Sequence, residues 1–200
     1  MLGDMAADDE TRTDRRKVRT RAALIAAGQE LIREGRDANA SIQTITDLAD
    51  VGFGSFYNHF ATKDELFDAA VAGAMTDYLD WLDEHLPEGA TPVQRLYESV
   101  RLTGRLALEL PATAAVLARR FTVVEVSNDS LGQRMRNDVT SAISTAKHPL
   151  NKNEVAILSL AAMGAMQTVL SATQTLTAEE TAEAGEVLAR GVLRLLSLSL

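Results

Sequence analysis

A helix–turn–helix pattern between Ser41 and Lys63 constrains the fold of this chain more than any other stretch. Ile45 and Leu48 belong to a helically spaced apolar face, and Ser41 ahead of them is a residue type that caps helices by accepting a backbone N–H. The sequence DVG at residues 50–52 interrupts this pattern, because aspartate tolerates left-handed backbone angles and glycine adopts them freely. These residues predict two short helices joined by a tight turn.

The second short helix is expected over about residues 53–60. Phe56 and Phe60 stand four residues apart, on one side of such a helix, and we assign both to the core. Ser55, Tyr57 and Asn58 supply polar groups nearby. Two helices that cross over a short turn, the second turned outward, form the arrangement with which helix–turn–helix domains enter a major groove.

Residues 51–67, VGFGSFYNHFATKDELF, resemble the recognition helix and following helix of the TetR family of transcriptional regulators, whose pattern there is roughly V-S-x-G-T-L-Y-x-H-F-x-S-K-E-x-L. Residues 41–49 resemble the family's T-V-x-x-I-A-x-x-A, with Thr46 where alanine is usual. Asp50 replaces the usual turn glycine, and Gly52 replaces the usual serine cap. The resemblance implies an all-α protein with an N-terminal DNA-binding domain and a C-terminal helical ligand-binding and dimerisation domain.

The N-terminal residues change from acidic to basic. Residues 1–11 lack a basic segment followed by an apolar run, so they are not a secretory signal, and we expect a disordered acidic tail. Arg15, Arg16, Lys17 and Arg19 belong to the basic run that follows. By itself a charge run is usually a solvated helix end. Ahead of a helix–turn–helix it becomes a candidate phosphate-binding arm, since such arms in other folds also reach a minor groove.

The composition favours an all-α globular chain. A hydrophobic content of 46% with 24% charged residues is ordinary for a soluble protein, and only four prolines interrupt the chain. The absence of cysteine excludes disulfides, thiolate nucleophiles and Cys-type zinc sites, and it fits a cytoplasmic location. The net charge of −8 disfavours general nucleic-acid affinity, so any DNA contact must come from a local basic surface.

We expect nine or ten helices in two domains. A helix over residues 20–34 joins the two short helices in a DNA-binding domain of residues 12–62. A helix from residue 63 to about 86 then opens a ligand-binding and dimerisation domain of residues 63–200. Capping-box sequences predict later helix starts at Thr91, Ser130, Asn151 and Thr177, and Pro111 marks a break. The resulting helices are expected over about 92–110, 112–125, 152–174 and 178–198, with a further one from residue 130.

Residues 155–178 carry no charge and are long enough to suggest a membrane span. Serine, threonine and glutamine dilute this stretch and no second span exists, so we favour a doubly buried helix of a soluble protein without a membrane partner. The helices at about 152–174 and 178–198 carry enough apolar surface for a four-helix contact between two copies. The family resemblance implies that this pair forms the homodimer interface.

Two copies are also required by DNA recognition, because one short helix makes too few base contacts for specificity. A homodimer would bind a double-stranded, palindromic operator with half-sites about 34–36 Å apart or a multiple of one turn. We predict that Phe53, Ser55 and Tyr57 lie closest to base edges and that Gly54 permits close approach. Two alternatives stay open: His59 as a helix-terminal residue stabilised by the dipole, and Tyr57 as packing. The other residues predicted to contact DNA, mainly at phosphates, are Arg15, Arg16, Lys17, Arg19, Thr44, Asn58, His59 and Lys63.

The helices predicted after residue 92 leave room for an apolar cavity. Residues of these types are more often ordinary core than the wall of a pocket, and an arginine pair such as the one at residues 119–120 is more often solvated than bound to a ligand. No cofactor is expected. The resemblance implies a ligand-responsive regulator, by the family's usual habit a repressor, released by a small, largely apolar effector. The candidate ligand-binding residues are Trp81, Tyr97, Leu102, Leu106, Arg120, Phe121, Met163, Met166 and Gln167.

An enzyme is the main alternative from another class, and we predict that the chain is not one. The three histidines are dispersed without metal-type spacing, and no G-x-S-x-G sequence occurs. Gly52 and Gly54 open a polar-aromatic helix without a preceding strand, so they do not form a phosphate loop. A ligand carrier or helical interaction module would leave the basic arm and the motif at residues 51–67 unexplained.

Overall fold

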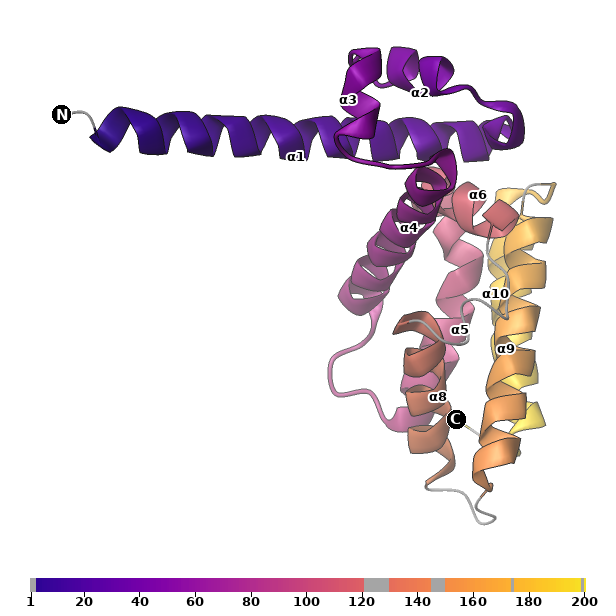
Figure 1. Ribbon diagram of the computed structural model, residues 1–200. Helices are drawn as coiled ribbons and strands as arrows, with labels where there is room; N and C mark the ends of the chain where they lie inside the picture. Colours follow the sequence, from indigo (N-terminus) through magenta and orange to yellow (C-terminus); the bar gives the residue numbers. More distant parts are fainter. Residues whose placement is uncertain (1–2, 121–129, 145–149, 174, 199) are drawn as a thin grey trace. The chain divides into compact units, whose positions relative to one another are not determined.

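The computed structural model describes residues 3–120, 130–144, 150–173, 175–198 and 200, and of residues 3–13 the backbone alone. Within these residues the chain forms nine α-helices and one short 3-10 helix, without a strand (Figure 1). The prediction of an all-α fold is therefore confirmed. The contacts divide the chain into two compact units, Met1–Gly73 and Ala74–Leu200, so the division falls inside the fourth helix and not at the predicted boundary after residue 62.

The N-terminal unit contains a long helix followed by the two short helices of the predicted motif. In Figure 1, α2 and α3 lie together on one side of α1. The N-terminal part of α4 completes the unit, and Gln29 of α1 ties the two together by donating its side-chain N–H to the carbonyl of Ala70 at 3.1 Å. The elements are α1 (Gly3–Glu34), η1 (Asp37–Asn39), α2 (Ile42–Leu48), α3 (Phe53–Tyr57) and α4 (Lys63–His85).

Helix α1 begins much earlier than predicted. Its backbone is helical from Gly3, so a helix start at residue 20 is wrong, and the tail predicted over residues 1–11 coincides with helical backbone from Gly3 onward. Alanine has the highest helix propensity, and acidic residues near a helix N-terminus are favourable to its dipole, which accounts for helix in this acidic segment. The predicted end is confirmed, because α1 stops at Glu34 and Gly35 takes a φ of 70°.

The turn between α2 and α3 follows the prediction. Ser41 caps α2 by accepting the N–H of Thr44 at 3.0 Å, and Asp50 adopts a left-handed φ of 52°. Gly52 precedes α3 in an extended conformation and supplies no side-chain cap. Helix α3 is shorter than predicted and ends at Tyr57. Phe60 is nevertheless 2% exposed, because the chain beyond the helix folds back into the core.

The C-terminal unit is built from the later helices, whose predicted starts are largely confirmed. Capping boxes with both reciprocal hydrogen bonds occur at Thr91, Asn151 and Thr177, whereas Ser130 is itself the first helical residue of its helix. Residues 121–125 of the helix predicted over 112–125 lie outside the described residues. The helices are α5 (Pro92–Glu109), α6 (Pro111–Arg120), α8 (Ser130–Ile143), α9 (Lys152–Ala172) and α10 (Ala178–Leu195).

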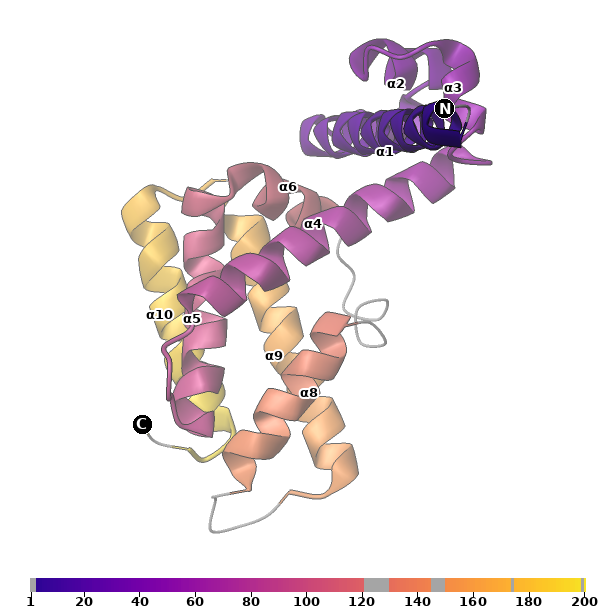
Figure 2. The ribbon, with the colours of Figure 1, turned by 90° about the vertical axis from the view of Figure 1, so that its left-hand side faces the viewer.

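Helices α5 and α10 run side by side and approach each other through a pair of glycines (Figures 1 and 2). A Cβ atom added at Gly104 would lie 2.5 Å from the carbonyl oxygen of Thr181 and 2.8 Å from the Cα of Gly185. A Cβ atom at Gly185 would lie 2.4 Å from the carbonyl oxygen of Arg101. The backbones are therefore in direct contact, which only glycine at both positions permits.

Helix α9 is buried on one face only, which corrects the expectation of a doubly buried helix. By length and composition it is the one described helix that could cross a membrane, but only 28% of its most apolar window is buried. Ile157 is 64% exposed, whereas Met163 on the opposite side is 1% exposed. The apolar residues of α9 therefore divide between the core and an uncovered surface.

The glycine contact predicts a large difference between two alanine substitutions. Gly104→Ala is expected to lower the free energy of unfolding by about 1–3 kcal/mol, because its methyl group meets backbone that cannot move aside. Gly73→Ala is the control, because its methyl group meets only side-chain atoms of a neighbouring helix, the nearest being the amide nitrogen of Gln29 at 3.2 Å, and no backbone of that helix. That variant should stay within about 1 kcal/mol of the wild type. Urea unfolding measures both, and equal stabilities would contradict the described contact.

Candidate DNA-binding surface and interior polar cluster

Helix α3 presents two aromatic side chains to solvent. Phe53 is 48% exposed and Tyr57 is 56% exposed, and their rings meet edge to face with centroids 5.9 Å apart. Phe56 lies on the opposite side and is fully buried, with its ring 5.4 Å from that of Tyr57. The core assignment of Phe56 and Phe60 is confirmed, and Tyr57 projects outward instead of packing inside the unit.

The neighbouring residues predicted to contact DNA lie on or beside the same surface. Gly54 is exposed, and a Cβ atom there would meet no atom within 4 Å. Asn58 is exposed at the C-cap of α3, and Ser55 and His59 are half-buried. Thr44 is half-buried, and its hydroxyl lies 2.8 Å from that of Ser41. Helix α3 and its flanks thus offer a surface of aromatic and small polar groups.

Lys63 has a protein partner that the sequence did not reveal. Its ammonium donates a hydrogen bond to the carbonyl of Ala40 at 2.7 Å, so this cation at a helix N-terminus is explained without a phosphate. The N-terminal cap of α4 is not a reciprocal capping box. Thr62 accepts the N–H of Glu65 at 3.1 Å, but the Glu65 carboxylate accepts the N–H of Ala61 at 2.7 Å.

The basic residues ahead of the motif lie on α1. Arg15, Arg16, Lys17 and Arg19 are all exposed, and Arg15 and Arg19 share one face because they stand four residues apart. Their positive charge is concentrated within two turns of a chain whose net charge is −8. An exposed cationic segment of this kind meets the requirement for a local basic surface.

The predicted ligand-binding residues are mostly packed in the core of the C-terminal unit. Trp81 donates its indole N–H to Glu109 at 3.1 Å, and Tyr97 donates its hydroxyl to Glu186. Gln167 donates its side-chain N–H to the carbonyl of Ala118 at 3.0 Å. Leu102, Leu106, Met163 and Met166 are buried, Arg120 is exposed at the end of α6, and Phe121 lies outside the described residues.

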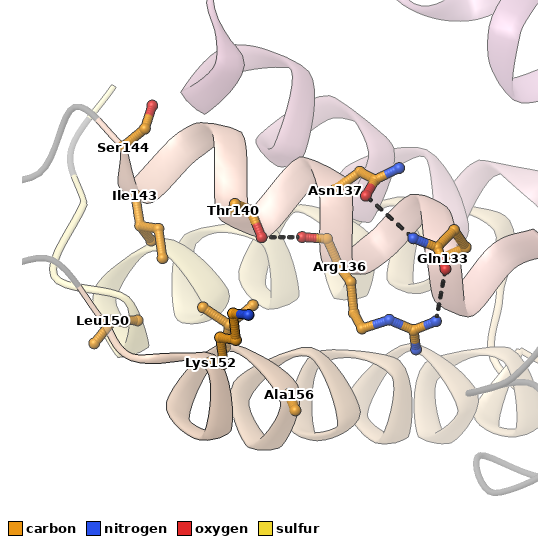
Figure 3. A pocket seen from close by; sticks show the side chains of 10 residues that line it. Gln133, Arg136, Asn137, Thr140, Ile143, Ser144, Leu150, Lys152 and Ala156 are labelled. Atoms are coloured by element: carbon orange, nitrogen blue, oxygen red, sulfur yellow. Dashed lines mark hydrogen bonds between the residues drawn. The ribbon is translucent and has the colours of Figure 1, made fainter.

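A hollow of about 460 Å³ lies between α8 and α9, and none of the predicted ligand residues lines it (Figure 3). Its polar groups bond to one another: Arg136 donates to Gln133 at 3.2 Å, and the Thr140 hydroxyl donates to the carbonyl of Arg136 at 2.7 Å. Lys152 and Ile143 complete opposite parts of its wall. The hollow therefore has a mostly apolar lining, and several of its polar groups already bond to one another.

A second group of polar residues lies inside the C-terminal unit, and its burial was not predicted from the sequence. Tyr78, Ser99 and Thr103 are at most 2% exposed, and the side chains of Arg134 and Asp138 are 18% and 11% exposed. We call these five residues the interior polar cluster. Three buried atoms have no hydrogen-bond partner: the Ser99 hydroxyl, Nε of Arg134 and Oδ2 of Asp138, whereas the buried hydroxyls of Tyr78 and Thr103 act on each other.

Ion pairs connect the interior polar cluster to the surface. Arg134 donates from its terminal nitrogen to Asp83 at 2.7 Å, and Arg95 lies 3.6 Å from Asp83 and 3.8 Å from Asp138. Burial raises the pKa of Asp138 despite the nearby guanidinium groups of Arg134 and Arg95. The hydrogen bond from Arg134 lowers the pKa of Asp83. The two carboxylates therefore stand in opposite electrostatic environments.

Burial also raises the pKa of Tyr78, against the opposing effects of the Thr103 hydroxyl and the Arg134 guanidinium. Thr103, Arg134 and Asp138 all act on this phenol, so the interior polar cluster is one site and not scattered groups. The Thr103 hydroxyl acts on the Tyr78 phenol as a hydrogen-bonding partner. The described residues contain no group of three or more carboxylates and histidines that would hold a metal ion.

Comparison with known families accounts for both units. Residues 24–70 match the family described as bacterial regulatory proteins, tetR family, and residues 92–200 match the tetracyclin repressor-like C-terminal domain. The second match alone covers more than half of the chain. This chain belongs to the TetR family. It is therefore a transcriptional regulator with a DNA-binding helix–turn–helix, as the resemblance in the sequence implied.

Relatives of this TetR-family regulator carry names of the same kind. The chain is 34% identical over 76 residues to the uncharacterized HTH-type transcriptional regulator YxbF of Bacillus subtilis. This match covers 38% of this chain and 20% of YxbF. The chain is 29% identical over 142 residues to the HTH-type transcriptional repressor Rv3405c of Mycobacterium tuberculosis. This match covers 67% of this chain and 73% of Rv3405c.

Among solved structures, RolR in complex with the ligand resorcinol has a similar fold. Its TM-score is 0.62 at 22% identity, and the match covers 93% of this chain and 91% of RolR. At this identity the likeness shows the fold alone.

The opposite pKa shifts predict opposite effects of two asparagine substitutions on this TetR-family regulator. The raised pKa of Asp138 means that its ionised form destabilises the folded state once the pH rises above the ordinary value of about 4. Asp138→Asn should therefore raise the melting temperature at pH 7, and the gain should shrink as the pH falls toward 4. Asp83→Asn should lower the melting temperature slightly at pH 7, because the pKa of Asp83 is lowered. A melting temperature of Asp138→Asn below the wild type at pH 7 would contradict this assignment.

Proposed function

We propose that this protein is a ligand-responsive repressor that binds a palindromic operator as a homodimer and is released by a small effector. The main support for this proposal is the exposure of Phe53 and Tyr57 on α3, the second helix of the helix–turn–helix. Because Phe56 is buried on the opposite side of α3, the side with Phe53 and Tyr57 faces solvent. The name of Rv3405c, a repressor, supports the direction of regulation. In this proposal the protein acts in the cytoplasm, where the operator DNA lies.

In this proposal α3 reads the major groove. Phe53 and Tyr57 supply apolar surface for thymine methyl groups, and the Tyr57 and Ser55 hydroxyls supply hydrogen bonds to base edges. Gly54 leaves open space in which the helix can approach the bases. Thr44, Asn58 and His59 bind phosphates, and Lys63 adds a phosphate contact with the ammonium hydrogens that Ala40 does not use.

The exposed residues Arg15, Arg16, Lys17 and Arg19 supply the remaining phosphate contacts. A gel shift against the DNA upstream of the protein's own gene, titrated with salt, tests the proposal. Binding should weaken steeply and log-linearly as salt rises, because phosphate contacts release counterions. Absence of any shift at low salt would overturn the proposed function. A carrier or helical interaction module, the alternative class, predicts that outcome.

Tyr57→Ala tests the reading surface directly. Operator affinity should fall by about 1–3 kcal/mol, the range measured for a good base contact. The free energy of unfolding should change by less than about 1 kcal/mol, because the side chain is 56% exposed. Leu108→Ala is the control, since Leu108 is 44% exposed in the other unit and its loss should leave operator affinity unchanged. Equal affinities for Tyr57→Ala and the control would show that α3 does not read the operator.

The proposed dimer interface is the uncovered apolar face of α9 and α10. Ile157 and Leu160 of α9 are 64% and 38% exposed, and Val187 and Leu195 of α10 are 55% and 54% exposed. Val187, Gly191 and Leu195 stand four residues apart and form one stripe, and a Cβ atom at Gly191 would meet no atom within 4 Å. The same two helices from a second copy would bury this stripe in a four-helix contact.

Ile157→Glu should shift the protein from dimer to monomer in analytical ultracentrifugation, because an unpaired carboxylate would be buried at the interface. Operator affinity should fall with it, since a monomer contacts one half-site. Leu108→Glu is the matched control, because it also places a carboxylate at an exposed leucine but outside the proposed interface. A dimer that survives Ile157→Glu would assign the interface to another surface.

Effector control requires a path between the two units, and α4 provides one because it contributes residues to both. We propose that a small, largely apolar molecule binds inside the C-terminal unit, pivots α4 and changes the spacing of the two α3 helices. Binding of resorcinol to RolR, a protein of similar fold, supports a small-molecule effector. Linkage requires that operator DNA weaken effector binding by the factor by which the effector weakens operator binding.

A further inference from the structure

The helix–turn–helix lacks the side chains that most often read guanine. Arginine or lysine donating to the O6 and N7 atoms of guanine is the commonest specific contact in a major groove. Residues 41–62, which include α2, the turn and α3, contain neither arginine nor lysine. The exposed carboxylates of Asp47 and Asp50 cannot replace them, because an ionised carboxylate only accepts hydrogen bonds. Recognition by this motif therefore depends on other features of the base edges.

The first residues of α3 present an apolar group to solvent. In a helix–turn–helix the N-terminal residues of the second helix contact the base edges. In this chain they are Phe53, whose side chain has no hydrogen-bonding atom, and Gly54, which has no side chain. Phe53 is 48% exposed, whereas Ser55 behind it is half-buried. The leading position of α3 therefore offers a hydrocarbon surface.

The ring of Phe53 belongs to a row of aromatic rings that begins in the core. Phe60 and Phe56 are buried, and their ring centroids lie 6.0 Å apart. The ring of Tyr57 packs edge to face on that of Phe56 at 5.4 Å, and the ring of Phe53 packs in the same way on that of Tyr57 at 5.9 Å. Edge-to-face packing favours one orientation of each ring. The exposed ring of Phe53 is therefore positioned by contacts that lead back to the core.

The edges of base pairs in the major groove offer one apolar group to such a ring. This group is the C5 methyl of thymine, since the other groups that distinguish the bases there are hydrogen-bond donors or acceptors. Phenylalanine is one of the side chains that contact it. Cytosine carries a hydrogen atom at the same position, and 5-methylcytosine carries the same methyl group as thymine. An apolar ring can therefore distinguish pyrimidines by their C5 methyl group.

We propose that Phe53 is a specificity-determining residue that reads the C5 methyl group of one pyrimidine in each half-site. The selected DNA carries a thymine at that position, and 5-methylcytosine is bound there in preference to cytosine. Tyr57 positions the ring, and Gly54 leaves space for the approach, because a Cβ atom there would meet no atom within 4 Å. This inference rests on the proposed function, and it adds the chemical group that the operator must carry.

Uracil tests the contact, because it lacks only the C5 methyl group of thymine and pairs with adenine in the same way. The probe is a synthetic duplex of the upstream DNA segment that the full-length protein protects. One thymine in each half-site is replaced by uracil, position by position. At one position the replacement should weaken binding about tenfold, because burial of a methyl group contributes roughly fourfold in affinity and the homodimer buries two. At that position 5-methylcytosine should be bound more tightly than cytosine by a similar factor.

Phe53→Ala should remove both preferences, so that duplexes with thymine and with uracil are bound with equal affinity. The comparison is made at low salt, where phosphate contacts keep the variant on the DNA. Leu48→Ala is the matched control, because Leu48 is also 48% exposed in the same unit but lies on α2. This control should retain the wild-type preference for the methyl group.

Three results would overturn the inference. They are equal wild-type affinity for thymine and uracil at every position, an unchanged preference in Phe53→Ala, and loss of all DNA binding by Phe53→Ala at low salt. The last result would make Phe53 a structural residue of the motif. Failure of the proposed function is distinguishable, because the wild type would then bind no upstream fragment. Tight binding that ignores the methyl group refutes this inference alone.

Discussion

Burial of Phe56 is the constraint on which the proposed DNA-facing surface depends. Helix α3 has five residues, too few to be stable as an isolated helix, so its rotation about its own axis is fixed by the side chain that it buries. With Phe56 fully buried, Phe53 and Tyr57 must face solvent. The left-handed Asp50 and the capped start of α2 set the direction from which the chain enters α3. The proposed reading surface therefore follows from core packing together with the turn that precedes α3.

The C-terminal unit combines one tightly packed contact with one unsatisfied site on the same helix. Helix α5 uses Gly104 to bring its backbone against α10, and it uses Ser99 and Thr103 to build part of the interior polar cluster. Close packing on one side stabilises the unit, while unpaired polar atoms on the other side cost stability.

Local chemistry was predictable from the sequence, and longer-range chemistry was not. The capping boxes at Thr91, Asn151 and Thr177 were predicted because each is decided within four residues. The start of α1 was missed because a charged segment continues a helix that forms further along the chain. The interior polar cluster was missed because Arg134 and Asp138, four residues apart, resemble an ordinary surface pair. Only the folded arrangement of α4, α5 and α8 shows that they are buried together with Tyr78.

The central claim is that two copies of α3, held outward by their buried phenylalanines, read one face of an operator. Hydroxyl-radical footprinting of the full-length protein on the DNA upstream of its gene tests this most directly. The account predicts two protected patches on one face of the duplex, with centres about 34–36 Å apart or a multiple of one helical turn. A single protected patch, or uniform protection along the fragment, would contradict it.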